Sequence, residues 1–279
     1  MVHHRAMLAW ATDIHLDFLE APERRAFVKR MVATGCEALL LTGDLSEQPA
    51  LRRHLREIAE GAGVPVYFVL GNHDYYHGAI DSGRREVREL CAELPQLTWL
   101  HGAGVVELRP GVALVGVDGW GDARLGAPDT TPMVLNDFRY IEELAWLDTK
   151  QRNAKLRALG DESAATLRAQ LAAALPEYNR VVVATHVPPF AEAAWHEGAL
   201  SNDDALPFFS CAAVGAVLLE TADAHPTKQL EIYCGHTHSP GVASLRPNLV
   251  VHTGGARYGH PDLAGTIALS RGDGDGSAT

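Results

Sequence analysis

The sequence is poor in cysteine, and its cysteines form no recognisable metal-binding or redox pattern. The chain of 279 residues has four of them, far apart and without a Cys-x-x-Cys pair: Cys36, Cys91, Cys211 and Cys234. Scattered cysteines of this kind indicate small buried side chains in a reducing compartment. Their spacing excludes a structural zinc site built from thiolates.

Long apolar runs are also missing. No stretch of about 18 apolar residues is present to span a bilayer. Arg5 stands near the start, but no apolar segment with a small-residue cleavage site follows it, so a secretory signal is not indicated. We expect a cytoplasmic protein with no membrane association.

Positive charge is in deficit. The 24 Lys and Arg residues are outnumbered by 35 Asp and Glu residues, which gives a formal net charge of −11. This balance argues against broad binding to nucleic acid or to anionic membranes. An anionic small-molecule substrate is still compatible with it, because bound cations would invert the sign of the local field.

Strand-like and helix-like segments alternate through the first third of the chain. Apolar runs predict strands at 7–12, 38–42 and 64–70, and helical patterns occupy 22–33, 49–60 and 84–94. This β-α-β-α-β order predicts a parallel sheet with right-handed crossovers. With no linker or repeat, we expect one α/β domain over 1–270 and a disordered tail over 271–279.

The middle of the chain changes character. Short apolar runs at 97–100, 104–108 and 112–117 suggest strands joined by hairpins, and a long loop follows to residue 132. Residues 136–147 and 162–175 are predicted to form two helices, separated by a break at Gly160–Asp161. The remaining predicted elements are strands at 181–185, 230–234, 249–253 and 265–269, a helix at 211–224 and an irregular loop at 190–210.

Side chains that can bind metals, from Asp, His and Asn, follow several predicted strands. The clearest case is Leu70–Gly71–Asn72–His73–Asp74, where Gly71 is expected to turn the chain and three polar side chains follow. In an open parallel sheet, ligands bind at the carboxyl ends of strands. One polar turn alone is compatible with a structural role, but related groups end four other strands: Asp13-x-His15, Gly43–Asp44, Thr185–His186 and Gly235–His236-x-His238.

These five strand ends predict a metal centre. On an extended backbone, residues i and i+2 point the same way, so Asp13 with His15 and His236 with His238 are natural chelating pairs. Seven or more imidazole and carboxyl groups brought together without cations would suffer desolvation and repulsion. Imidazole, carboxylate and amide oxygen suit manganese, iron or zinc. Seven ligands exceed one tetrahedral ion and fit two ions that share a carboxylate, an arrangement used for displacement at phosphorus.

In kind and order, these motifs resemble the calcineurin-like metallophosphoesterase superfamily. The match includes Gly43–Asp44-x-x-Glu47 and covers residues 13–238. The resemblance implies a four-layer αββα sandwich, here with a helical insertion around 136–175, and a dinuclear site at the carboxyl edge of the sheets. It also implies two divalent metal ions and hydrolysis of a phosphate ester through attack by a hydroxide held between them.

The resemblance further implies a role for each motif residue. One metal takes Asp13, His15, Asp44 and His238, and the other takes Asp44, Asn72, His186 and His236. His73 then acts as an acid beside the phosphoryl group. Asp74 would either orient His73 or cap the following helix, and we count it as a candidate catalytic residue.

Departures from the family pattern narrow the function. Leu45–Ser46–Glu47–Gln48 lacks the Arg-Gly of the protein Ser/Thr phosphatases, and Glu47 stands where purple acid phosphatases have a tyrosine ligand. The Asp74 ending resembles phosphodiesterase and nucleotidase branches. We therefore expect a dinuclear metal-dependent phosphoesterase that hydrolyses a phosphodiester or a nucleotide-like small molecule. A phosphomonoesterase is the alternative, and a non-catalytic metal-binding scaffold is a third possibility.

Residues outside the motifs give weaker indications. Tyr75, Trp120 and Arg257 are candidate substrate contacts, although aromatic residues after a turn more often serve packing and a loop residue more often has no special role. Tyr76 and Tyr258 follow Tyr75 and Arg257 directly, and His196 belongs to the loop after His186. All three have the same two interpretations. His54 has no partner in any pattern, so we expect it at the surface.

Overall fold

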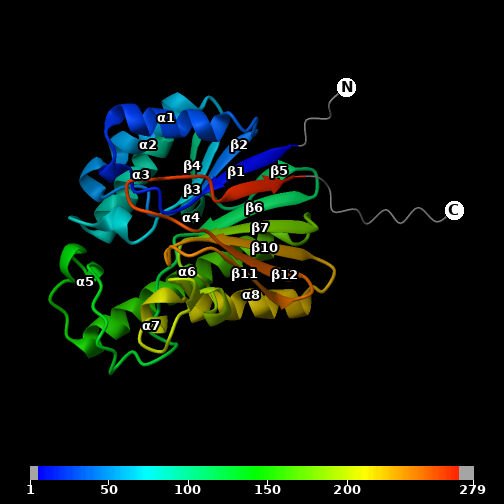
Figure 1. Ribbon diagram of the computed structural model, residues 1–279. Helices are drawn as coiled ribbons and strands as arrows, with labels where there is room; N and C mark the ends of the chain where they lie inside the picture. Colours follow the sequence, from blue (N-terminus) through cyan, green and yellow to red (C-terminus); the bar gives the residue numbers. More distant parts are fainter. Residues whose placement is uncertain (1–5, 270–279) are drawn as a thin grey trace.

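The structure, a computed structural model, describes residues 6–269, in which two large sheets lie face to face between layers of helices (Figure 1). The predicted tail at 271–279 lies outside the described residues. The first sheet has the order β13-β1-β2-β3-β4, in which only β13 runs antiparallel to its neighbour. Its strands are β1 (Met7–Ala11), β2 (Ala38–Thr42), β3 (Val66–Val69), β4 (Leu97–Trp99) and β13 (Gly265–Ala268).

The second sheet has the order β11-β12-β10-β7-β6-β5. Its four central strands are parallel, and the two edge strands run antiparallel to them. The strands are β5 (Val106–Arg109), β6 (Val112–Val117), β7 (Arg180–Thr185), β10 (Gln229–Cys234), β11 (Gly241–Arg246) and β12 (Leu249–Thr253). Parallel strands bring their carboxyl ends to one edge of a sheet, which is where the predicted site residues stand.

Helices cover the outer face of each sheet. The first sheet is covered by α1 (Ala21–Val32), α2 (Gln48–Ala62) and α3 (Ile80–Glu93), and the second by α6 (Thr149–Ala174) and α8 (Ala212–Ala224) (Figure 1). Shorter elements complete the described chain: η1 (Leu16–Phe18), η2 (His73–Tyr75), α4 (Leu100–Ala103), α5 (Asp137–Tyr140), η3 (Ala191–Ala193), β8 (Trp195–His196), β9 (Ala199–Leu200) and α7 (Leu206–Phe209).

Side-chain alternation along the strands creates three separate cores. In β1, Ala9 faces the helices, whereas Leu8 and Trp10 face the opposite sheet. In β7, Val183 packs with the core under α6 and α8, and Val182 packs between the sheets. Successive residues of a strand point to opposite faces, so each sheet is buried on both sides. These cores give the four-layer αββα arrangement that the sequence predicted.

The predicted break in the helical region is wrong. Helix α6 is continuous from Thr149 to Ala174 and passes through Gly160. A Cβ atom at Gly160 would lie 2.6 Å from the Cβ of Asp122, so this glycine allows α6 to pack closely on a neighbouring loop. The predicted helix at 136–147 is reduced to the single turn of α5. Glycine here serves packing, whereas the sequence pattern suggested a helix breaker.

Residues 123–148, which we call the arm, leave the second sheet and extend to the first. The arm contains α5 and projects from the body of the molecule (Figure 1). It is attached by a bridge between Gly78 and Ile141, by the backbone N–H of His77, which donates to the carbonyl of Tyr140, and by that of Glu142, which donates to Gly78. Thus the arm reaches the loop that follows β3.

The structure also tests the predictions about the cysteines and about membrane-spanning segments. Cys36, Cys211 and Cys234 are buried and free, as predicted for small core side chains, and Cys91 is half-buried. Within residues 6–269, no helix combines the length and hydrophobicity needed to cross a membrane.

Candidate metal centre

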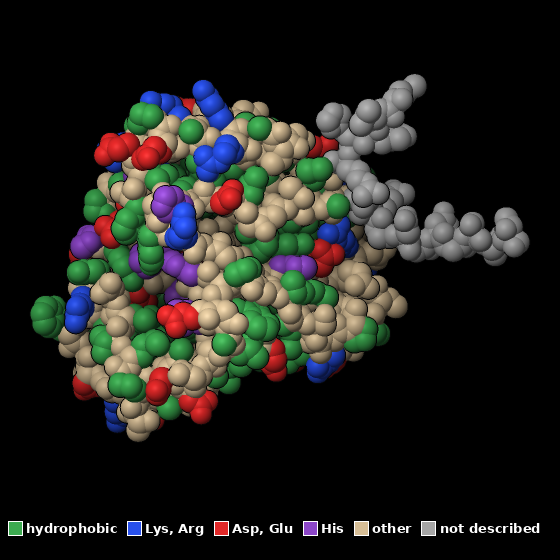
Figure 2. All heavy atoms as spheres, viewed as in Figure 1, with side chains coloured by type: hydrophobic (Ala, Val, Ile, Leu, Met, Phe, Trp, Pro, Cys, Tyr) green, Lys and Arg blue, Asp and Glu red, His purple; other side chains and the backbone are tan. Residues whose placement is uncertain are grey.

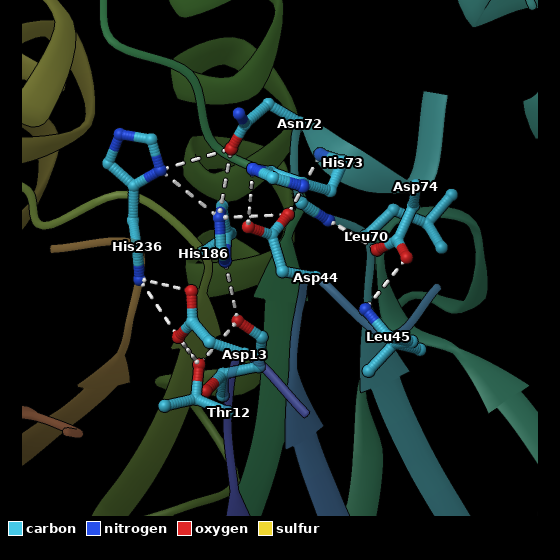
Figure 3. Close-up of polar contacts among 12 residues, drawn as sticks. Thr12, Asp13, Asp44, Leu45, Leu70, Asn72, His73, Asp74, His186 and His236 are labelled. Carbon is cyan, nitrogen blue, oxygen red and sulfur yellow. Dashed lines mark hydrogen bonds and ion pairs between the residues drawn. The ribbon is translucent and has the colours of Figure 1, made fainter. Parts of the chain in front are cut away.

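All five predicted strand ends meet at one edge of the two sheets. Asp13 and His15 follow β1, Asp44 follows β2, and Asn72 follows β3, whereas His186 and the pair His236 and His238 follow β7 and β10 of the other sheet. Figure 3 shows the side chains of Asp44, Asn72, His186 and His236 close together, with the carboxylate of Asp13 beside the backbone of His236. Five of the seven residues are almost completely buried: Asp13, His15, Asp44, Asn72 and His186.

These side chains form two groups that share one carboxylate. In the first, ligand atoms of Asp13, His15, Asp44 and His238 all lie within 4.8 Å of one another. The Nε2 atom of His238 is 3.4 Å from the Nε2 of His15 and 3.4 Å from the Oδ1 of Asp13.

The second group is formed by Asp44, His186 and His236, whose ligand atoms meet the same limit of 4.8 Å. The Nε2 of His186 is 3.3 Å from the Oδ1 of Asp44 and 3.2 Å from the Nδ1 of His236. The Oδ1 of Asn72 is 3.2 Å from the Nε2 of His186 and 3.0 Å from the Nδ1 of His236. Asp44 therefore stands between the two groups.

The spacing and chemistry of these donors fit divalent cations. Metal–ligand bonds of about 2.0–2.2 Å place neighbouring ligand atoms roughly 3 Å apart, close to the separations found here. The donors are imidazole nitrogens, carboxylates and an amide oxygen, a set suited to manganese, iron or zinc. The buried Nδ1 of His15 also lacks a hydrogen-bond partner within the described chain.

The electrostatics show how closely the groups are coupled. Burial would raise the pKa of Asp44, but the facing His186 and His73 lower it well below its usual range. Burial would lower the pKa of His186, but Asp44 raises it to about 10. In contrast, burial lowers the pKa of His236 to about 3 and that of His15 to about 4. The carboxylates of Asp44 and Asp13 thus raise the pKa of His186, and a divalent cation at this site would take the place of its proton.

The calcineurin-like phosphoesterase family model matches residues 7–240, a span that contains all five strand ends. The chain belongs to the calcineurin-like phosphoesterases. It is accordingly a metal-dependent hydrolase of phosphoric esters, of a family with a dinuclear metal site. A search among curated proteins finds no matching sequence.

Several solved structures resemble this phosphoesterase in fold. A phosphopantetheinyl hydrolase from Mycobacterium tuberculosis aligns with a TM-score of 0.66 and 16% identity over 91% of each chain. A dimetal phosphatase from Danio rerio aligns with a TM-score of 0.56 and 13% identity, over 90% of this chain and 87% of that one. A protein from Thermus thermophilus has a TM-score of 0.55 and 18% identity, over 90% and 89%.

The backbone of this phosphoesterase is unusual at the strand ends. Strands β1 and β10 end at Ala11 and Cys234, before the paired site residues begin. The expectation that these pairs lie on extended backbone is therefore wrong. Five site residues instead have left-handed φ angles: Asp13 (49°), His15 (38°), Asp44 (51°), His236 (70°) and His238 (59°). Such conformations cost about 1–3 kcal/mol each and are concentrated at functional sites.

Gly71 has a different role from the one predicted. Its φ is not in the left-handed region, so the chain does not need a glycine for the turn. A Cβ atom at this position would lie 2.7 Å from the Nε2 of His186 and would also collide with the carboxylate of Asp44. Gly71 is required because the β3 loop approaches the ligand atoms so closely.

His73 and Asp74 point to different parts of the molecule. The backbone N–H of His73 donates to the Oδ1 of Asp44 over 2.9 Å, and its ring stacks on Tyr76 with a centroid distance of 4.2 Å. Asp74 neither orients His73 nor caps a helix. Its carboxylate accepts the backbone N–H groups of Leu45 (2.7 Å), Ser46 (2.8 Å) and Gly71 (2.8 Å), which joins the β2 and β3 loops (Figure 3).

A pocket of about 350 Å³ opens over both groups of donors. Figure 2 shows histidine side chains gathered in a hollow on this face. His73 is at the pocket, together with Asp44 and ligands from both groups, and among the described residues no Lys or Arg lines it. Further lining comes from Tyr76, Asp137, His196, Phe209 and Tyr258.

The three predicted substrate contacts do not line this pocket. Tyr75 is fully buried and donates to the Oδ2 of Asp118, and Trp120 stacks on it with 2% of its surface exposed. Both are core residues. Arg257 lines a separate pocket of about 480 Å³ beside α1. Tyr258, its neighbour, is the residue of that loop that reaches the site.

Two further residues differ from the sequence expectation. His54 is buried, and its Nδ1 is 2.8 Å from the hydroxyl of Ser46 next to the site. Asp137 was not predicted, because it belongs to no motif and stands 65 residues from its partner Asn72.

Proposed function

We propose that this phosphoesterase hydrolyses a small phosphodiester or nucleotide-like molecule at a centre of two divalent metal ions. The observation that carries the proposal is the position of Asp44, which belongs to both groups of donors. One carboxylate between two such groups is the arrangement that a two-metal phosphoryl site needs.

We assign the ligands from the donor atoms. Asp13, His15 and His238 would hold one ion with Asp44. Asn72, His186 and His236 would hold the other, again with Asp44. Manganese, iron and zinc all suit these donors. When bound, the two cations supply charge for the phosphoryl oxygens and lower the pKa of water at the site.

His73 is our candidate for the general acid. Its side chain is 16% exposed, and its Nε2 is 3.9 Å from the Oδ2 of Asp44, so it is at the pocket next to the ligands. An imidazole in this position can donate a proton to the leaving oxygen of the ester. Stacking on Tyr76 and the hydrogen bond from its backbone to Asp44 keep the ring in place.

The pocket lining favours a diester. A phosphate monoester carries up to two negative charges, whereas a diester carries one. Within residues 6–269, no Lys or Arg lines the pocket to neutralise a second charge. Tyr258, which is 44% exposed, instead offers aromatic surface beside the donors, which suits an uncharged leaving group such as an aryl or nucleoside moiety.

The test compares initial rates of the Mn²⁺-loaded protein on bis(p-nitrophenyl) phosphate and on p-nitrophenyl phosphate. We expect a higher kcat/KM for the diester, and we expect Asp44→Asn to abolish it. A preference for the monoester would make the protein a phosphomonoesterase. Absence of a metal-dependent rate on both compounds would contradict the proposed activity and favour a metal-binding scaffold.

A further inference from the structure

Asp137 is a buried carboxylate from the arm that ends beside the candidate metal centre. It is 4% exposed and belongs to the short helix α5. Its Oδ1 accepts a hydrogen bond from the Nδ2 of Asn72 over 2.8 Å and another from the hydroxyl of Tyr76 over 2.7 Å. Both donors belong to the loop after β3, so one oxygen atom of the arm accepts two side-chain hydrogen bonds from this loop.

The contact determines which way the amide of Asn72 faces. A carboxylate accepts hydrogen bonds, so the NH₂ group of Asn72 has to face Asp137. The amide oxygen is then directed to the opposite side, where it lies 3.0 Å from the Nδ1 of His236 and 3.2 Å from the Nε2 of His186. A reversed amide would present NH₂ to these donors, and NH₂ cannot bind a cation.

Further contacts hold the arm in the position that places Asp137 beside Asn72. The Gly78–Ile141 bridge follows α5 directly, and two carboxylate oxygens of Glu143 accept the backbone N–H groups of Ile80 and Asp81 at the start of α3. These attachments fix α5 against the β3 loop. The position of Asp137 therefore depends on the docked arm.

We propose that Asp137 is a positioning residue, which holds the oxygen of Asn72 toward the second metal and so makes the arm part of the metal centre. This inference rests on the two-metal site proposed above. Residues that orient metal ligands typically change metal affinity by 10–100-fold when they are replaced. We expect Asp137→Ala to weaken binding of the second ion by this factor and to leave the first ion in place.

The arm offers a matched control. The exposed Asp129 also accepts a hydrogen bond from an asparagine side chain, the Nδ2 of Asn153 over 3.0 Å. It belongs to the same segment and has the same chemistry, but its partner Asn153 is on α6 and is in neither group of candidate ligands among the described residues. Asp129→Ala removes a comparable bond from the arm and should leave both metal affinities unchanged.

The experiment titrates the metal-free wild type and variants with Mn²⁺ by calorimetry. Electron paramagnetic resonance then separates coupled pairs of Mn²⁺ ions from single ions. We expect a coupled pair in the wild type and in Asp129→Ala, and chiefly single ions in Asp137→Ala at the same concentration. Asp137→Asn keeps an oxygen acceptor and should restore most of the second affinity. Tyr76→Phe removes one of the two hydrogen bonds to Asp137, so it should weaken binding of the second ion less than Asp137→Ala does.

The possible results distinguish this inference from the proposed function. If the wild type binds no pair of ions, the two-metal function fails. If the wild type binds a pair and Asp137→Ala binds it equally well, only the role of Asp137 fails. Equal losses in Asp137→Asn and Asp137→Ala would overturn the positioning role, because the charge of Asp137 would then matter more than its acceptor atom. Circular dichroism of each variant verifies that it is folded.

Discussion

The neighbouring residues His73 and Asp74 contribute to the site in two different ways. His73 is at the pocket and contacts Asp44 through its backbone, whereas Asp74 is fully buried and holds two loops together. Replacing the first should affect chemistry, and replacing the second should affect the scaffold that positions the ligands.

For His73 we expect His73→Asn to reduce kcat by about 10²–10⁴-fold, the usual contribution of a general acid. The two bound metals should remain, because His73 is in neither group of donors. Metal analysis of the purified variant, combined with its initial rates, tests this prediction. A parallel loss of metal and activity would show that His73 is a ligand.

For Asp74 we expect Asp74→Ala to lower the free energy of unfolding by about 3 kcal/mol or more. Three backbone N–H groups lose their acceptor, and an unsatisfied buried donor costs about 1–3 kcal/mol. Urea denaturation measures the change. A variant as stable as the wild type but inactive would instead support a direct catalytic role for Asp74.

His54 gives a prediction about pH. Burial, followed by repulsion from Arg24 and Arg53, lowers the pKa of His54 to about 4 from an ordinary value of 6.5. Between these pH values the unfolded chain binds a proton that the folded chain does not, so stability falls as the pH is lowered through this window. His54→Gln should show a smaller loss of stability between pH 7 and pH 5 in urea denaturation. An equal loss in both proteins would contradict the assignment.

At the scale of secondary structure, buried strands were the most predictable elements. The bounds of β2, β6 and β12 agree with the sequence expectation, because strands covered on both faces are short apolar runs with clear ends. Strand β11 was missed because it is an exposed edge strand whose residues carry little apolar signal. Helix α6 was divided at Gly160, where close packing on Asp122 outweighs helix propensity.

The packing of α6 leads to a test at this position. Alanine would favour the helix by about 1 kcal/mol over glycine, but crowding in a packed site costs about 1–3 kcal/mol. Since the Cβ atoms of residues 160 and 122 would be 2.6 Å apart, we expect Gly160→Ala to lower the Tm by a few degrees. Differential scanning calorimetry decides between the two effects, and a higher Tm would mean that propensity prevails.

At the scale of the whole molecule, the candidate metal centre joins the two sheets. Asp13, Asp44 and Asn72 come from the first sheet, and His186 and His236 come from the second. The sequence predicted these residues because each is beside a strand end with a recognisable local pattern. It could not predict Asp137, since that contact depends on how a distant segment folds back onto the site.

Removal of the metals should therefore affect stability throughout the molecule. Ligand binding to the folded state stabilises it by about 2.7 kcal/mol when the free ligand is at 100 times its dissociation constant. We expect EDTA to lower the Tm of the wild type relative to the Mn²⁺-loaded protein, and Asp44→Asn to show little difference between the two conditions. A Tm that does not depend on metal in the wild type would contradict a bridging centre.

The pairing of β1 with β13 has a consequence for synthesis on the ribosome. Met7 is paired with Ala268, so one edge of β1 is completed by almost the last residues of the described chain to be translated. Until those residues emerge, β1 presents unpaired backbone groups, and such an open strand edge is a template for pairing with other chains. The nascent chain is thus exposed to aggregation for the whole interval between the synthesis of β1 and that of β13, and β1 is the segment that chaperones would need to shield.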